Sequence, residues 1–198
     1  MKVLITTRFI SHNPGYSTGE QLAKGFIESG HDVVLYGNTY GAPNIWHGQK
    51  EILEEKFDII IIMECNDGYP QYNLNFLNLK NVPRFYWDFD VSYHSDISFS
   101  RAKLQNPDGF LVANKYFIDK NGFGKFNKPV LHLPYACSTS IHRKIDTIEK
   151  SFFIGFIGGL HNERKRFLDV IKETVYNKAS VYIGENIFNE NLIKATNQ

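Results

Sequence analysis

The chain has 198 residues, of which 42% are hydrophobic and 22% are charged, and its formal net charge is +1. It is long enough for one globular domain of about 150 residues plus a fragment. The near-neutral charge excludes a strong electrostatic field for nucleic acid or an anionic membrane. No apolar run approaches the length of about 20 residues that a membrane-spanning helix needs.

The two cysteines, Cys65 and Cys137, lie far apart and belong to no CxxC or CxxxH pattern. This spacing predicts reduced thiols, not a disulfide or a zinc site. The first residues, MKVLITTRF, are too short and too polar for a secretion signal. We therefore expect a cytoplasmic protein.

Short apolar runs alternate with amphipathic stretches along the chain. The first helix is predicted from Ser17 and Glu20, which have capping-box spacing, and from Gly30 as its stop. The predicted strands, in chain order, are residues 3–6, 32–36, 58–63, 84–87, 109–113, 130–133, 152–157 and 180–183. The predicted helices are residues 18–29, 45–55, 70–79, 98–105, 116–121 and 163–175.

Strands that alternate with helices predict an α/β fold with a Rossmann-like, doubly wound parallel sheet. We expect the strand order 3-2-1-4-5, or an extension of it, up to residue 133. Residues 138–150 are the most polar stretch late in the chain and predict a linker. The chain would then divide into a domain at 1–137 and the first βαβ of a second Rossmann-like domain at 151–198.

The loop after the first strand contains Gly15, Ser17, Thr18 and Gly19. Its glycines do not fit the G-x-G-x-x-G pattern, and the second strand ends in Tyr36, where dinucleotide enzymes have Asp or Glu. NAD and FAD are therefore not expected. The glycines suit either a flexible loop before a capped helix or a loop that contacts a ligand.

The loops after the third and fourth strands contain Asp67, Asp88, Asp90 and His94. These loops meet at the carboxyl edge of a parallel sheet, where ligands bind. A carboxylate beside an imidazole can act in acid–base chemistry, and acidic and aromatic residues suit a hydroxylated ligand. The same residues also fit a solvated polar loop or, through the D-x-D spacing, a divalent metal site. We expect no metal, and we expect His132 to be a core or near-core residue.

A glycine pair, Gly158 and Gly159, follows the predicted strand at 152–157. The next helix is predicted to have Arg164, Lys165 and Arg166 in its first turn. Cations are disfavoured there because a helix N-terminus already carries partial positive charge. A bound diphosphate would reverse that penalty and use the free backbone N–H groups. The alternative is a solvated basic helix start.

Three stretches resemble the GT-B glycosyltransferases, and among them the CgeB-like, or spore maturation protein-like, group. The stretch MKVLITTRF…STGEQLAKGFIESGHDVVLYG resembles the first βαβ of their N-terminal domain. The succession FYWDFD, PDGFLVANKYFIDKNGFG and VLHLPYACSTSIHRKI resembles motifs of the group in their order. The stretch FFIGFIGGLHNERKRFLDVI resembles the opening of the donor domain.

The resemblance implies an acceptor-side domain at 1–137 and a donor domain that begins at 151. It implies transfer of a hexosyl group from a nucleotide-sugar to an unknown acceptor in the interdomain cleft. The nucleotide-sugar would be a co-substrate, and no cofactor is expected. Asp88 and His94 are then the candidate catalytic residues. The candidate acceptor contacts are Gly15, Ser17, Thr18, Asp67 and Asp90. The candidate contacts of the donor diphosphate are Gly158, Gly159 and Arg164.

A donor domain of this fold is much longer than residues 151–198, so we expect a truncated form. The half-built second sheet would leave apolar surface exposed, so we expect self-association or a complementing C-terminal segment as a partner. The alternative is a non-catalytic Rossmann-like module that binds a sugar, a nucleotide or a partner chain.

Overall fold

The computed structural model describes residues 1–6, 18–36, 49–63, 81–88, 95–119, 121–136, 146, 154–157, 162–175 and 181–184. Two compact units divide the chain, Met1–Ala136 and Cys137–Gln198.

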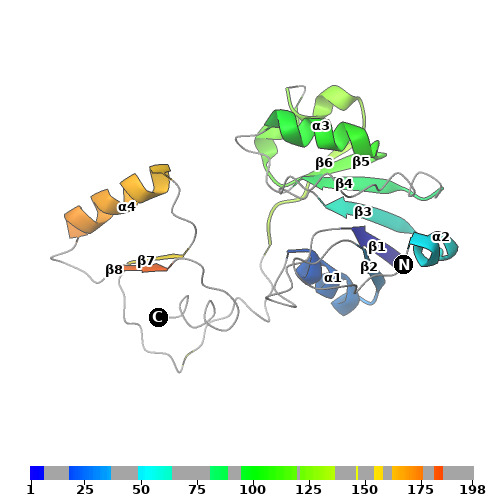
Figure 1. Cartoon of the computed structure of the whole chain (residues 1–198), viewed down its shortest axis with the longest axis horizontal. Helices are drawn as coiled ribbons and strands as arrows, with labels where there is room; N and C mark the ends of the chain where they lie inside the picture. The colour runs from blue at the N-terminus through cyan, green and yellow to red at the C-terminus, as the bar shows by residue number, and fades with distance from the viewer. Residues whose placement is uncertain are drawn as a thin grey trace. The chain divides into compact units, whose positions relative to one another are not determined.

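The first unit is built on a six-stranded, all-parallel sheet in the order β2-β1-β3-β4-β5-β6. Helices lie on both of its faces, with α1 on one side and α3 on the other (Figure 1). This confirms the predicted Rossmann-like α/β fold. The strands are β1 (Lys2–Thr6), β2 (Asp32–Tyr36), β3 (Ile59–Met63), β4 (Arg84–Asp88), β5 (Gly109–Val112) and β6 (Val130–His132). The helices are α1 (Thr18–Glu28), α2 (Gln49–Glu54), α3 (Ser95–Gln105) and the 3-10 helices η2 (Lys115–Phe117) and η3 (Phe123–Phe126).

The expected strand order 3-2-1-4-5 is wrong, because β3 pairs with β1 and not with β2. The reason lies in the side chains of the two strands. β3 is the run IIIIM, and four of its five residues are buried. Such an aliphatic run suits a strand covered on both faces, which is a central one. β2 is only partly buried and forms one edge of the sheet.

One face of the sheet is covered by α1, and we call it the α1 face. Ala23 of α1 belongs to a buried cluster with Val3, Ile5, Ile61, Met63 and Trp87. The helix ends at a left-handed Gly30 with φ 80°. The Gly30 N–H donates to Ile27 O at 2.9 Å, and the His31 N–H donates to Phe26 O at 3.0 Å. These two bonds form a Schellman cap, which confirms the predicted stop at Gly30.

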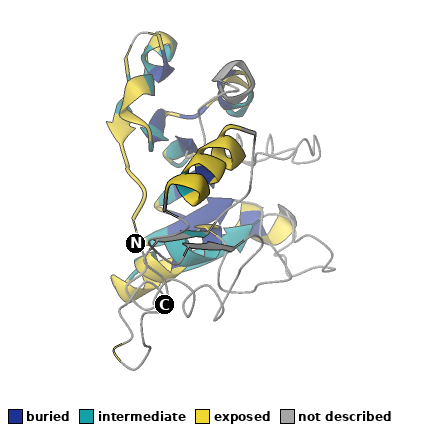
Figure 2. Cartoon of the chain, turned by 90° about the vertical axis from the view of Figure 1, so that its left-hand side faces the viewer, coloured by how far each residue is buried: buried dark blue, intermediate teal, exposed yellow. Residues whose placement is uncertain are grey.

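The opposite face packs against α2, α3 and η3, and we call it the α3 face. Its core is aromatic: the Phe99 and Phe123 rings are 5.1 Å apart, and the Phe110 and Phe123 rings are 5.0 Å apart. The buried colour of Figure 2 is concentrated in the strands. The buried members of this cluster are Leu4, Ile52, Phe57, Ile60, Ile62, Tyr86, Phe99, Ala102, Phe110, Val112 and Phe123.

Two local expectations are corrected. The helix predicted at 116–121 is the shorter η2, and η3 follows it where no element was predicted. The turn between them needs glycine, because a Cβ at Gly122 would lie 2.1 Å from Phe117 O. His132 is exposed and not near the core. It lies in β6, the edge strand, and the side chains of Leu131 in that strand and of Leu133 just after it are exposed as well.

The second unit contains β7 (Ile154–Ile157), α4 (Asn162–Val175) and β8 (Val181–Gly184). β7 and β8 pair in parallel, from Ile154↔Val181 to Ile157↔Gly184, in a two-stranded sheet of their own. Leu168 of α4 is buried, whereas Phe167 and Val170 are exposed. Most of α4 has the colour of exposed residues in Figure 2. The unit is a βαβ motif in which one strand returns parallel to the other after a helix.

Candidate functional site

The carboxyl edge of the six-stranded sheet contains a topological switch point. From β1 the chain first adds β2 on one side, and then places β3 and the later strands on the other side. The arrows of β3 and β4 point to the same edge (Figure 1). Ligands of open α/β sheets bind outside the carboxyl ends of the strands, at the point where the order reverses. Here that point lies between β1 and β3.

Asp88 is the last residue of β4 and lies at this edge. Its side chain is fully buried, with an exposure of 0%. The backbone is held by β5, because the Ala113 N–H donates to Asp88 O at 3.0 Å and Asp88 pairs with Val112 in register. A carboxylate in this setting has a fixed position and is shielded from water, which suits it to orient a neighbouring polar group. His94, its predicted catalytic partner, lies outside the described residues.

The predicted acceptor contacts can be located only in part. Thr18 is the first residue of α1, and it is exposed. Gly15, Ser17, Asp67 and Asp90 lie outside the described residues. That these side chains gather around Asp88 stays a prediction.

Thr6 is a residue of this edge that the sequence analysis missed. It ends β1, is only 2% exposed, and lies on the same sheet face as Asp88. The register shows this, because Thr6 pairs with Ile62, Ile62 pairs with Tyr86, and Asp88 is two residues beyond Tyr86. A threonine after three apolar strand residues has no sequence signal that separates it from an ordinary strand end.

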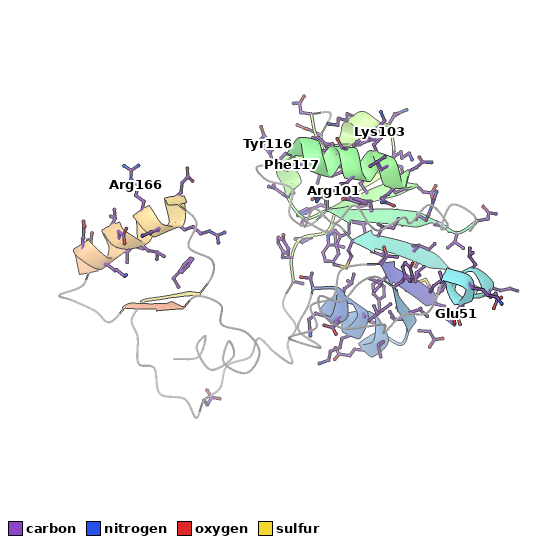
Figure 3. The ribbon with its side chains drawn as sticks, viewed as in Figure 1. Glu51, Arg101, Lys103, Tyr116, Phe117 and Arg166 are labelled. Atoms are coloured by element: carbon purple, nitrogen blue, oxygen red, sulfur yellow. The ribbon has the colours of Figure 1, made fainter. Side chains whose placement is uncertain are left out.

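A second set of side chains at this edge, which the sequence did not predict as part of the site, follows β5. Asn114 caps η2, and its side chain accepts the Tyr116 N–H at 3.0 Å. The Tyr116 ring is 77% exposed and meets the Phe117 ring edge-on at 5.2 Å. In Figure 3, Tyr116 and Phe117 lie toward the edge to which β3 and β4 point, and Lys103 lies toward the opposite edge. The turn therefore presents an exposed tyrosine on a fixed backbone.

The end of β6 lies beside that turn. His132 pairs in register with Val112, and its Nε2 is 3.2 Å from Ala113 O. Tyr135, three residues further along the chain, is 61% exposed. Two tyrosines and a histidine thus lie at or just after the ends of two neighbouring strands, a grouping that the sequence did not predict because it depends on the pairing of β5 with β6.

In the second unit, Arg164 lies in the first turn of α4 and is exposed. The helix begins at Asn162, one residue earlier than predicted, so Arg166 belongs to the second turn and not to the first. Arg166 extends from α4 on the side away from β7 and β8 (Figure 3). Gly158 and Gly159 lie outside the described residues, so their place beside Arg164 stays a prediction.

Within the described ranges, no group of three or more His, Cys, Asp or Glu side chains is arranged to hold a metal ion. In the same part of the chain, no helix is both long enough and apolar enough to cross a membrane.

Compared with protein-family models and with curated proteins, the chain matches none.

Proposed function

We propose that the chain is a glycosyltransferase of the GT-B type, or a piece of one, that transfers a hexosyl group from a nucleotide-sugar to an acceptor. The strongest support is the combination of two parallel α/β units in one chain. The first has a buried carboxylate at the ligand edge of a doubly wound sheet. The second is a βαβ motif whose helix has two cations, Arg164 and Lys165, in its first turn.

The acceptor binds, on this proposal, at the carboxyl edge of the first unit. The side chain of Asp88 is too deeply buried to reach a solvent-exposed hydroxyl, so its role is to orient a base. His94 is the base, and it takes the proton of the acceptor hydroxyl. The acceptor oxygen then bonds to the anomeric carbon of the sugar as the bond from that carbon to the diphosphate oxygen breaks, and the nucleoside diphosphate leaves.

The donor diphosphate binds, on this proposal, at the start of α4. Arg164 and Lys165 lie where the helix dipole is positive, and each exposed cation there costs about 0.3–1 kcal/mol without a ligand. Glu163 in the same turn offsets part of this cost. A diphosphate interacts favourably with the cations and with the free backbone N–H groups of the first turn.

Isothermal titration calorimetry with a nucleoside diphosphate tests the donor site. We expect Arg164→Ala to weaken binding about tenfold or more, because a hydrogen bond to a charged group contributes about 1.5–3 kcal/mol. Arg164→Lys should restore only part of the loss, since lysine lacks the planar, two-pronged donor. Lys172→Ala is the matched control: it removes one charge from the last turn of the same helix.

Equal affinities of Arg164→Ala, Lys172→Ala and the unmodified chain would show that the basic turn is only a solvated helix start. Incubation with a panel of nucleotide-sugars and measurement of the released nucleoside diphosphate then test catalysis. Binding without release, in the presence of a mixture of sugar acceptors, would support the non-catalytic binding module instead.

A further inference from the structure

The hydroxyl of Thr6 stands out in the core of the first unit. Apart from the polar atoms of Tyr86 and Trp87, Thr6 and Asp88 are the buried polar side chains among the residues that the structure describes. The Thr6 Oγ1 atom is buried and, within that part of the chain, has no hydrogen-bond partner. The rest of β1 after Lys2 is apolar and fully buried.

Within the described residues, this hydroxyl makes no hydrogen bond that would stabilise the fold. A hydroxyl taken out of water without a new hydrogen bond lowers the stability of the folded state. Valine has the same branched shape without the hydroxyl, and it favours strands at least as strongly as threonine does. Among the described residues the hydroxyl has no partner, so the folded chain should be more stable with valine at position 6, and a ligand is one source of the missing partner.

The position of Thr6 indicates where that partner comes from. Thr6 ends β1 at the switch point, where its register partners are Tyr36 of β2 and Ile62 of β3. It shares the α3 face with Asp88, which lies two strands away, about 10 Å across the sheet at the usual strand spacing. Thr6 and Asp88 thus flank the carboxyl end of β3 on one face of a layer that is otherwise made of aliphatic and aromatic side chains, Tyr86 among them.

We propose that Thr6 is a ligand-binding residue, whose hydroxyl forms a hydrogen bond with a sugar hydroxyl that enters the sheet edge between β1 and β3. The choice of a sugar as the ligand rests on the proposed function. Because Thr6 is only 2% exposed, the sugar hydroxyl penetrates the edge and does not rest on the outer surface. Thr6 thereby positions the acceptor on the face that carries Asp88.

The test uses the full chain with 13C-labelled threonine methyl groups. Glucose, galactose, mannose and N-acetylglucosamine are titrated, and the Thr6 methyl signal is followed by NMR. We expect at least one of these sugars to shift that signal. In Thr6→Val the affinity for this sugar should fall about tenfold, the effect of one ordinary hydrogen bond. Thr6→Ser, which keeps the hydroxyl, should retain most of the affinity.

Stability is measured on the same variants by urea unfolding, and it separates a binding role from a structural one. Thr6→Val should be more stable than the unmodified chain while it binds the sugar more weakly. Ile5→Val is the matched control, because Ile5 is the buried neighbour on the α1 face. It should not change the sugar affinity.

Two results would overturn the proposal: a Thr6→Val chain that is less stable than the unmodified one, or a Thr6 methyl signal that none of the four sugars shifts. Nucleoside diphosphate binding distinguishes this failure from failure of the proposed function. If the nucleotide binds and the methyl signal stays still, the Thr6 contact fails and the donor site stands. If a sugar shifts the signal and no nucleotide binds, the Thr6 contact stands and the glycosyltransferase proposal fails.

Discussion

Two glycines of the first unit differ in how much space surrounds them. At Gly122, between η2 and η3, an added Cβ would lie 2.1 Å from the backbone oxygen of Phe117. At Gly25, within α1, an added Cβ would meet no atom within 4 Å. Gly122 is required by a close backbone contact. Gly25 has no such contact, and its main effect is to give the unfolded chain more backbone freedom, which is lost when the helix forms.

Alanine at these two positions should therefore change stability in opposite directions. Gly122→Ala should lower the free energy of unfolding by about 2 kcal/mol or more, because the clash is with backbone and cannot be relieved by a side-chain rotation. Gly25→Ala should raise it by about 0.5–1 kcal/mol. Urea unfolding followed by circular dichroism measures both. An unchanged or higher stability of Gly122→Ala would contradict the contact at Phe117, and a loss of stability in Gly25→Ala would contradict the open space at that position.

At the scale of elements, two aspartates join neighbouring strands at the amino edge of the sheet. Asp58, just before β3, accepts the Lys2 N–H at 2.7 Å and donates its own N–H to Lys2 O at 2.9 Å. Asp108, just before β5, makes the same pair of bonds with Arg84, at 2.8 Å and 2.7 Å. Lys2 begins β1 and Arg84 begins β4. Each aspartate therefore helps to set the register of one strand pair.

Removing either carboxylate should loosen the amino edge. We expect Asp58→Ala and Asp108→Ala each to lower the free energy of unfolding by about 1 kcal/mol, the contribution of one such hydrogen bond. Asparagine keeps an acceptor oxygen and should restore part of the loss. The control is Glu28→Ala, whose exposed pair with Lys24 at 3.8 Å contributes at most about 0.5 kcal/mol. Thermal unfolding of the three alanine and two asparagine variants ranks these effects, and an equal loss in Glu28→Ala would refute the register argument.

Most of the elements could be predicted from the sequence, because their apolar periodicity and stop residues are local signals. Gly30 ends α1 as expected. The order of the strands could not be predicted from periodicity, which does not say which strands are neighbours, although the aliphatic run of β3 already favoured a central position. η3 was missed because two glycines, Gly122 and Gly124, interrupt its pattern.

The candidate site could be predicted only where a distinctive side chain follows a strand. Asp88 met that condition, and the structure places it at the expected edge. Thr6 did not, since an unpartnered hydroxyl is a property of packing and leaves no trace in the sequence. The exposure of His132 likewise depends on the place of β6 at the edge of the sheet, which the chain order alone does not reveal.

At the scale of the whole molecule, the two units differ in how much core they hold. The first unit has six strands and a buried cluster on each face of its sheet. The second has two strands, and Leu168 is the buried hydrophobic side chain in its described part. A two-stranded sheet has little stability of its own. The cooperative stability of the chain should therefore come from residues 1–136.

A chain of residues 1–136 should fold alone. We expect a single cooperative thermal transition, with a midpoint close to that of the main transition of the full chain. Near-ultraviolet circular dichroism of the buried aromatic residues measures this transition. The matched control is residues 1–108, which lacks Phe110 and Phe123 of the aromatic core and should not fold. If 1–136 shows no transition, the two units depend on each other for folding.

The strand order also has a consequence for synthesis on the ribosome. β4, β5 and β6 each pair with the strand that immediately precedes them in the sheet and in the chain. An N-terminal region emerges from the ribosome first and can begin to fold there. Once β3 has paired with β1, each later strand of this sheet leaves the exit tunnel when its partner is already in place. We expect the sheet to grow outward strand by strand in the order of translation, so that β6, the last to be made, is also the last to join.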